Sequence, residues 1–559
     1  MSMESKQENT YLDISFANFL AARSGLDGRQ KDEFNAIVLR LSASLAEGHS
    51  CLNVSPVEEQ LLSNLSLVAV TGRQDATSLT PLVLHGTNLY LARYYNYESR
   101  LARQLRVLAD KRFTEEADSD IIDILFPGES AAGSDQMRAA LTALARPLII
   151  VNGGPGTGKT TTVVKMLSLL VASSNTSLRI GLAAPTGKAA MRLSESIGNS
   201  LEKLGLPDAV REAMPKTAVT LHRLLGVQKN SPQFRHSSAR PLAHDVVVID
   251  EASMVDLAMM SKLVDALKPG SRLILLGDKD QLASVESGAV LADLISSFPA
   301  SSVELRKTYR FDDNIKQLAT SINASEHEQV WQQLTGATAD NVSLCAADDL
   351  YSYLSLRYGD YLSFVQDITS PLESDVRDIF SRFNNFQVLC CVAFSERGVM
   401  AINRRVEQRL AAKGLQCKHN EWYPGRPVLI TRNDYGLDLY NGDIGICLWS
   451  SEKQGLRVWF ERPDGSLRSC AINMLPTFET VYAMTIHKSQ GSEFGEVLVV
   501  LPKEDNRVLS RQLIYTAVTR AKQKVSIVAD RSILKLALLR QHPRRSGLRE
   551  MIVQESMPR

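Results

Sequence analysis

The stretch Gly153–Thr160, with the sequence GGPGTGKT, decides the fold of this chain. It follows the apolar run LIIV at 148–151 and leads into the helical sequence TTVVKMLSLL at 161–170. A glycine-rich loop between a strand and a helix turns several backbone N–H groups toward one point, and the helix dipole adds positive charge there. The sequence therefore predicts a phosphate-binding loop rather than a glycine-rich turn that binds nothing.

The loop predicts ATP as the ligand and Mg²⁺ as its companion ion. The ammonium group of Lys159 is expected on the β- and γ-phosphates, and the hydroxyl of Thr160 on the metal. The whole predicted nucleotide-binding run is Gly153, Gly154, Pro155, Gly156, Thr157, Gly158, Lys159, Thr160 and Thr161.

Two carboxylates follow a second apolar run, VVVI at 246–249. Asp250 and Glu251 stand at the carboxyl end of a predicted strand, where ligands gather in parallel sheets. Asp250 is expected to hold Mg²⁺ together with Thr160, and Glu251 to deprotonate the attacking water. An acidic pair after a strand can also be a helix N-cap, but the phosphate loop favours the catalytic interpretation.

Hydrolysis of a nucleoside triphosphate also needs a γ-phosphate sensor and an arginine that neutralises charge in the transition state. Gln281, in LGDKDQL, is the candidate sensor. Arg310, in LRKTYRF, and Arg520, in YTAVTRAK, are the candidate arginines. A single arginine more often forms a surface ion pair, so these assignments depend on the rest of the set.

Short apolar runs alternate with helical stretches along most of the chain, which predicts parallel sheets covered on both faces. One series lies at 148–151, 180–184, 246–249 and 273–276, and a second at 388–394, 497–501 and 525–529. Residues 415–478 differ, because short strands there are separated by Asn-Gly and Asp-Gly turns. We predict an α/β protein with two parallel-sheet lobes, a small β-barrel insertion at 415–478, a helical segment at 1–112 and a linker at 113–134.

The composition excludes several function classes. The 63 Lys and Arg residues balance 62 Asp and Glu residues, so no global basic field attracts nucleic acid and any DNA contact must be local. Seven cysteines without CxxC spacing indicate reduced thiols, and no apolar run approaches the roughly 18 residues of a membrane span. We expect a cytoplasmic protein without membrane contact.

The set and order of motifs resembles superfamily 1 helicases, and within them the RecD-like group. Beyond the phosphate loop and the acidic pair, the resemblance rests on APTGKAA (184–190), TLHRLLG (220–226), LGDKDQLASV (276–285), LRKTYRF (305–311), YAMTIHKSQGSEF (482–494) and LIYTAVTRAK (513–522). It implies two RecA-like lobes: lobe 1A at 135–300, with a 1B hairpin near 227–243, and lobe 2A at 301–559, with an SH3-like 2B insertion at 415–478.

The same resemblance implies roles for residues that chemistry alone does not single out. Gln136 is expected to read adenine, and Gly491 to line the nucleotide site. The residues expected along single-stranded DNA are Thr186, Lys188, His222, Thr485, His487, Ser489 and Gln490. Histidines at 222 and 487 are otherwise more often packing or capping residues.

The function implied is an ATP-driven 5′ to 3′ DNA translocase and helicase that acts on single-stranded and duplex-end DNA. It would form a heterotrimer with RecB and RecC in double-strand break repair and recombination. A free-standing helicase of the same superfamily is the alternative. A metabolite kinase and a regulatory subunit with an idle ATP site are more distant rivals, and no nuclease carboxylate cluster is recognisable.

Residues 1–112 carry no phosphate-binding motif but contain a helix rich in Tyr and Arg, including Tyr94, Tyr95 and Tyr97. Tyrosine and arginine are enriched at protein interfaces. We predict that this segment docks onto a larger complex and contributes nothing to the nucleotide pocket. An extra helical layer of the motor core is the alternative, and base stacking by the tyrosines is a weaker one.

Overall fold

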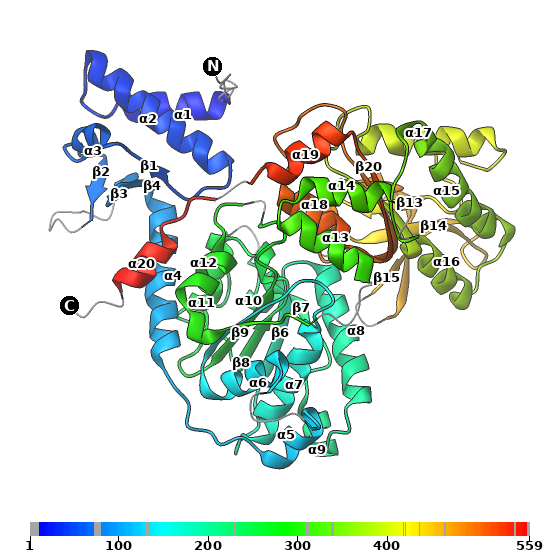
Figure 1. Cartoon of the computed structure of the whole chain (residues 1–559), viewed down its shortest axis with the longest axis horizontal. Helices are drawn as coiled ribbons and strands as arrows, with labels where there is room; N and C mark the ends of the chain where they lie inside the picture. The colour runs from blue at the N-terminus through cyan, green and yellow to red at the C-terminus, as the bar shows by residue number, and fades with distance from the viewer. Residues whose placement is uncertain are drawn as a thin grey trace.

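The computed structural model describes two α/β lobes, an N-terminal domain and a β-sheet insertion (Figure 1). The described residues are 10–71, 80–128, 133–228, 231, 233–284, 286–307, 313–336, 340–417, 419, 421–434, 436–462, 465–541 and 544–555. Among them, no helix is long and apolar enough to cross a membrane.

Lobe 1 is built on a six-stranded parallel sheet in the order β10-β5-β9-β8-β6-β7. Its strands are β5 (Leu148–Asn152), β6 (Ile180–Ala184), β7 (Val219–Thr220), β8 (Val246–Ile249), β9 (Arg272–Gly277) and β10 (Ser302–Glu304). Its helices are α5 (Ser119–Leu125), α6 (Asp135–Ala145), α7 (Lys159–Ala172), α8 (Gly187–Lys203), α9 (Asp208–Ala213), α10 (Leu221–Leu225), α11 (Leu257–Asp265) and α12 (Val290–Ser297).

Both faces of this sheet are buried, as continuous apolar strands predict. Along β5, Ile149 and Val151 enter a core formed with α6, α7 and α8, whereas Leu148 and Ile150 enter a core formed with α11 and α12. Within the expected 1B region, isolated antiparallel bridges join Val227 to Phe234 and Ser237 to Arg240.

Lobe 2 is built on a five-stranded parallel sheet in the order β11-β20-β19-β12-β18. Its strands are β11 (Val342–Leu344), β12 (Phe386–Cys390), β18 (Ala483–Thr485), β19 (Phe494–Val500) and β20 (Ala521–Val528). Its helices are α13 (Asp313–Asn323), α14 (His327–Thr335), α15 (Leu350–Asp367), α16 (Glu373–Asn385), α17 (Val399–Ala412), α18 (Arg511–Val518) and α19 (Arg531–Leu539).

The insertion in lobe 2 is a five-stranded antiparallel sheet in the order β16-β15-β14-β13-β17. Its strands are β13 (Pro427–Ile430), β14 (Ile444–Ser450), β15 (Gly455–Glu461), β16 (Leu467–Ala471) and β17 (Phe478–Thr480). They enclose a small separate core that includes Val428, Cys447 and Phe460. Its description as an SH3-like barrel stays a prediction.

The N-terminal segment differs from the helical domain that the sequence predicts, because it contains a four-stranded sheet in the order β1-β4-β3-β2. Its elements are α1 (Tyr11–Ala21), α2 (Gly28–Ala46), β1 (Leu52–Asn53), α3 (Pro56–Leu62), β2 (Val68–Val70), β3 (Leu82–His85), β4 (Asn88–Leu91) and α4 (Ala92–Asp110). Strands of two to four residues are too short to show a period of two in the sequence.

Helix α4 packs within the chain, because its buried Leu101 and Leu105 join the core that α11 and α12 form under lobe 1. The rings of Tyr94, Tyr95 and Tyr97 are partly buried against the same core. The tyrosine-rich helix thus packs as a layer on lobe 1. That residues 1–112 dock onto a larger complex stays a prediction.

The C-terminal end of the chain returns to lobe 1 and the N-terminal domain. After α19 in lobe 2, the C-terminal helix α20 (Leu548–Gln554) packs against α4 and α12 (Figure 1). The buried side chains of Leu548, Met551 and Ile552 complete the lobe 1 core. The expected linker at 113–134 also includes ordered structure, since it contains α5, whose N-cap is Asp118.

Candidate functional site

The phosphate loop joins β5 to α7, in the strand-loop-helix setting that the sequence predicts. Gly156 and Gly158 have φ angles of 76° and 79°, which L side chains rarely adopt, so glycine is required at both positions. Lys159 Nζ donates to the carbonyls of Gly153 at 2.7 Å and Gly154 at 3.2 Å. The lysine is therefore held folded over the loop, with its charge inside the cradle.

The acidic pair lies at the carboxyl end of β8, as expected. Glu251 adopts a left-handed backbone with a φ of 51°, and its N–H donates to Asp250 Oδ1 at 2.9 Å. Burial and then the neighbouring charge of Glu251 raise the pKa of Asp250 to about 6, while Lys159 opposes that shift. Two adjacent carboxylates thus lie near a single lysine, so their negative charge exceeds the positive charge of that lysine. This excess favours the binding of a further cation.

A cavity of about 510 Å³ opens in front of the loop, within the range of small-molecule sites. Both lobes contribute to its wall. The lining residues that the sequence predicts for the nucleotide are Pro155, Gly156, Gly158, Lys159, Thr160, Thr161, Asp250, Glu251, Gln281, Gly491 and Arg520. Gln136 is buried in the first turn of α6 and is not among the lining residues. Arg310 lies outside the described residues.

Arg520 crosses from lobe 2 to lobe 1 in this site. Its Nη2 donates to Gln281 Oε1 at 2.6 Å, and its Nη1 donates to the carbonyl of Ser492 at 3.2 Å. Both Arg520 and Gln281 are buried. The candidate sensor and the candidate arginine finger are therefore in direct contact.

Three further hydrogen bonds cross the same boundary. Tyr515 Oη donates to Asp278 Oδ2 at 3.1 Å. The backbone N–H of Leu282 donates to Thr516 Oγ1 at 2.9 Å, and Gln490 Nε2 donates to the carbonyl of Leu282 at 3.2 Å. The segment around Gln281 is thus joined to lobe 2 at several successive positions.

Comparisons with known proteins agree with this geometry. Residues 136–287 match the model of an AAA domain, and residues 480–528 match that of a UvrD-like helicase C-terminal domain. The RecBCD enzyme subunit RecD of Mycobacterium tuberculosis H37Rv is 38% identical over 96% of this chain and 94% of that protein. The same-named subunit of Haemophilus influenzae is 34% identical over 91% of this chain and 87% of that protein.

The chain belongs to the RecD family. It is an ATP-hydrolysing DNA helicase. The ATP-dependent RecD2 DNA helicase of Deinococcus radiodurans is 31% identical over 82% of this chain, but over only 57% of its own length.

The residues that RecD family resemblance assigns to DNA occupy two places in the structure. In lobe 1, Thr186 caps α8, and His222 lies in α10 with its ring 5.8 Å from that of Phe234. Lys188 Nζ lies 5.3 Å from the centroid of the Phe494 ring of lobe 2, and burial lowers the pKa of Lys188 to about 7.

In lobe 2, the assigned residues follow β18, which ends at Thr485. Burial lowers the pKa of His487. Ser489 is fully buried and its hydroxyl donates to the carbonyl of Ile486 at 2.7 Å, whereas Gln490 faces Leu282 of lobe 1. In this conformation Ser489 and Gln490 bond to protein, and their DNA contacts stay a prediction.

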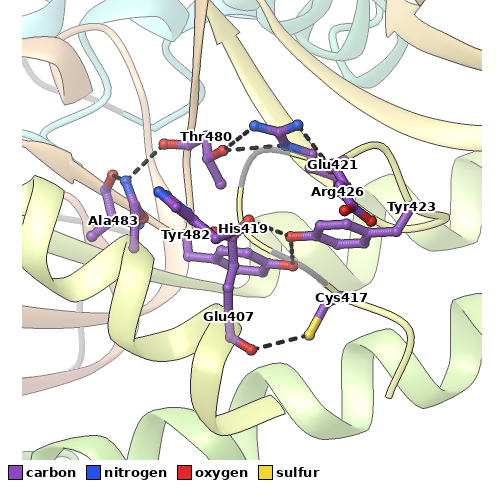
Figure 2. A network of polar contacts seen from close by, with 10 residues as sticks. Glu407, Cys417, His419, Glu421, Tyr423, Arg426, Thr480, Tyr482 and Ala483 are labelled. Carbon is purple, nitrogen blue, oxygen red and sulfur yellow. Dashed lines mark hydrogen bonds and ion pairs between the residues drawn. The ribbon is translucent and has the colours of Figure 1, made fainter. Parts of the chain in front are cut away.

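A buried polar network fixes the strand that leads to these residues (Figure 2). Glu407 accepts from Tyr423 Oη at 2.8 Å, and the hydroxyls of Tyr423 and Tyr482 are 3.0 Å apart. Asn403 Nδ2 donates to the carbonyls of Thr480 at 2.7 Å and Ala483 at 3.2 Å. Helix α17 and the inserted sheet thereby hold the start of β18 in place.

Sequence reasoning missed Asp278, Tyr515 and Thr516. Tyr515 and Thr516 lie within LIYTAVTRAK and Asp278 within LGDKDQL, so the motifs contained all three, but no feature of the sequence singled them out. The pairing of Tyr515 with Asp278 spans 237 residues, and a single sequence gives no sign of it.

Proposed function

We propose that this RecD family member moves 5′ to 3′ along single-stranded DNA as the motor subunit of a complex with RecB and RecC. It would act at duplex DNA ends in double-strand break repair and recombination. The observation that carries the proposal is the cavity walled by both lobes, with Arg520 joined to Gln281 across it. Hydrolysis at a site shared by two lobes changes the contacts between the lobes. Repeated closure and opening then moves one lobe along the DNA strand relative to the other.

Each residue of the site has a role in this cycle. Lys159 neutralises the β- and γ-phosphates, and Glu251 takes the proton of the attacking water. Gln281 orients that water and the γ-phosphate, while Arg520 and Arg310 stabilise charge in the transition state. Gln136 would contact adenine from α6.

Mg²⁺ fits the same site. Thr160 and Asp250 offer the hydroxyl and carboxylate oxygens that this ion prefers, and the raised pKa of Asp250 indicates a carboxylate in need of positive charge. When bound there, Mg²⁺ would neutralise phosphate charge. The protein's part is to present Thr160 from the first turn of α7 and Asp250 from the end of β8 to the same cavity.

A free-standing helicase is the second candidate. Sequence identity favours the subunit, because the chain is 38% identical to the mycobacterial RecD subunit over 96% of its length, against 31% to the Deinococcus RecD2 helicase over 82%. We place the partner contact on the N-terminal domain that precedes α4. There, helix α1 exposes the large apolar side chains of Tyr11, Leu12 and Phe19.

The direct test compares the wild-type chain with Lys159→Gln on single-stranded DNA. We expect DNA-stimulated ATP turnover in the wild type and none in the variant, with the fold intact because Lys159 is a partly exposed residue at the start of α7 rather than a core residue. Displacement of a block from the 3′ end of the tracked strand supports the polarity, and displacement only from the 5′ end reverses it. Co-purification with RecB and RecC distinguishes the subunit from the free-standing helicase.

A further inference from the structure

The segment that follows Gln281 is held from its other side by the C-terminal end of the chain. Arg544 lies between lobe 2 and the helix α20. Its Nη1 donates to the carbonyls of Glu286 and Gly288, the latter at 3.1 Å, and lies 3.5 Å from Ser284 Oγ. Hydrogen bonds from a charged donor are stronger than those between neutral groups, so this single side chain restrains several backbone positions at once.

The N-terminal domain completes the same junction. The N–H of Gly288 donates to the carbonyl of Gly48 at 2.9 Å. The Arg544 guanidinium lies flat against Gly48, where a Cβ would come within 2.9 Å of its Cζ. Gly48 has a φ of 86°, so both the space and the backbone require glycine there. Glu286 and Gly288 are therefore held by the C-terminal end of the chain, and Gly288 also by the N-terminal domain.

The next residues of the C-terminal end are anchored beside this junction. The N–H of Arg545 donates to His49 Nδ1 at 2.7 Å, and Ser50 N–H donates to the carbonyl of Arg545 at 3.0 Å. The buried carboxylate of Glu98 accepts from Ser546 Oγ at 2.9 Å and from the N–H of Gly547 at 3.1 Å. Arg544 thus projects from a fixed backbone, which makes it a suitable restraint for its neighbour.

Gln281 stands only three residues before Ser284. On its own side, this stretch is bonded to lobe 2 through Arg520, Thr516 and Gln490. Asp278, before Gln281, accepts from Tyr515, and the carbonyls of Glu286 and Gly288, after it, accept from Arg544. Contacts on both sides of Gln281 restrict where its side chain lies, and a displacement of about 1 Å at a catalytic group is enough to slow a reaction.

We propose that Arg544 is a positioning residue of the ATPase, which fixes Ser284, Glu286 and Gly288 and so keeps Gln281 aligned with Arg520 and the γ-phosphate. The inference rests on the proposed role of Gln281. It assigns a catalytic consequence to the C-terminal end of the chain, far from the phosphate loop in sequence.

The test uses Arg544→Ala in the full chain, with Arg545→Ala as the matched control. Both variants remove one positive charge, but the Arg545 contacts given above use only its backbone. We expect Arg544→Ala to lower kcat of the DNA-stimulated ATPase about tenfold while KM for ATP changes less than about twofold, the pattern of a lost transition-state interaction. Arg545→Ala should turn over ATP like the wild type.

Hydrogen exchange gives a readout of position that does not depend on turnover. Without nucleotide, the amide of Gly288 and its neighbours should exchange faster in Arg544→Ala and at the wild-type rate in Arg545→Ala. Arg544→Lys keeps the charge but loses the planar fork, so it should be intermediate and stays informative if the alanine variant fails to fold. Slower turnover without faster exchange at 284–288, or equal turnover in both alanine variants, overturns the inference.

Combination with Gln281→Ala separates this inference from the proposed function. If Arg544 acts through Gln281, the double variant should be no slower than Gln281→Ala alone. Multiplied losses overturn the inference and leave the role of Gln281 standing. Wild-type turnover in Gln281→Ala would overturn both.

Discussion

The guanidinium of Arg520 donates to the amide oxygen of Gln281 at 2.6 Å, and this contact joins two lobes through residues 239 positions apart. Both side chains are buried and both line the cavity in front of the phosphate loop. The two lobes are therefore in contact at the wall of this cavity. Under the proposed function, nucleotide bound there would contact this pair and so link occupancy of the site to the arrangement of the lobes.

Replacement of Arg520 with alanine should slow DNA-stimulated ATP hydrolysis by about 10³-fold, because arginine fingers act on charge that develops in the transition state. ATP binding, measured by equilibrium titration, should change far less. Equal losses in affinity and turnover would show that Arg520 supports the ground state or the fold. Arg310→Ala is expected to slow hydrolysis to a similar extent and to leave ATP binding similarly little changed.

The bond between Tyr515 and Asp278 should hold the lobes closed. Tyr515→Phe removes only the hydroxyl that reaches Asp278, a carboxylate that is 2% exposed. We expect kcat to fall about tenfold to 100-fold with the fold retained, since a hydrogen bond to a charged group contributes about 1.5–3 kcal/mol. Tyr361→Phe is a matched control, because that hydroxyl bonds to the carbonyl of Gly425 within lobe 2. Identical turnover in the two variants would remove Tyr515 from the mechanism.

The sequence predicted the parts of the site that are contiguous in the chain. The loop Gly153–Thr160 and the pair Asp250–Glu251 follow buried strands, and the backbone alone determines where they lie. Their chemistry is therefore readable without a structure. Arg520 lines the cavity from the second lobe, and its action on the nucleotide stays a prediction.

The remaining contacts depend on which distant segments pack together. Asp278 with Tyr515, and Arg544 with Gly288, join residues more than 230 positions apart. No local periodicity encodes such pairs. The N-terminal sheet was missed for a different reason, because strands such as Val68–Val70 carry too few residues to distinguish them from loops.

The stability of the contact between the N-terminal domain and residues 544–547 should depend on pH, because this contact includes the titratable carboxyl of Glu98. Burial raises the pKa of this carboxyl to about 7, against an ordinary value of 4.5. Between these two pKa values the folded chain binds more protons at Glu98 than the unfolded chain does. The contribution of Glu98 to the free energy of unfolding is therefore greatest at low pH and falls as pH rises toward about 7. Asp293 nearby, whose pKa burial raises to about 6, acts in the same direction.

Urea unfolding between pH 5 and pH 8 checks this prediction. The side chain in Glu98→Gln cannot titrate. As pH rises, the unfolding free energy of the wild type should therefore fall relative to that of the variant. The two proteins should then differ by a constant amount above about pH 8. A difference that is independent of pH throughout would show that Glu98 is already ionised in the folded chain at pH 5.

Docking of a partner subunit should depend on the exposed face of α1. Tyr11, Leu12 and Phe19 are 93%, 78% and 52% exposed, and large apolar side chains grouped on one short helix are typical of an interface. Replacing all three with alanine keeps good helix formers in place and removes most of the apolar area.

We expect co-purification with RecB and RecC to fall at least about tenfold, since truncation of two or three interface anchors costs several kcal/mol. Val57→Ala, which alters a 75% exposed side chain on α3 of the same domain, should assemble normally. Circular dichroism verifies that the triple variant stays folded, and normal assembly of a folded triple variant would place the partner contact on another surface.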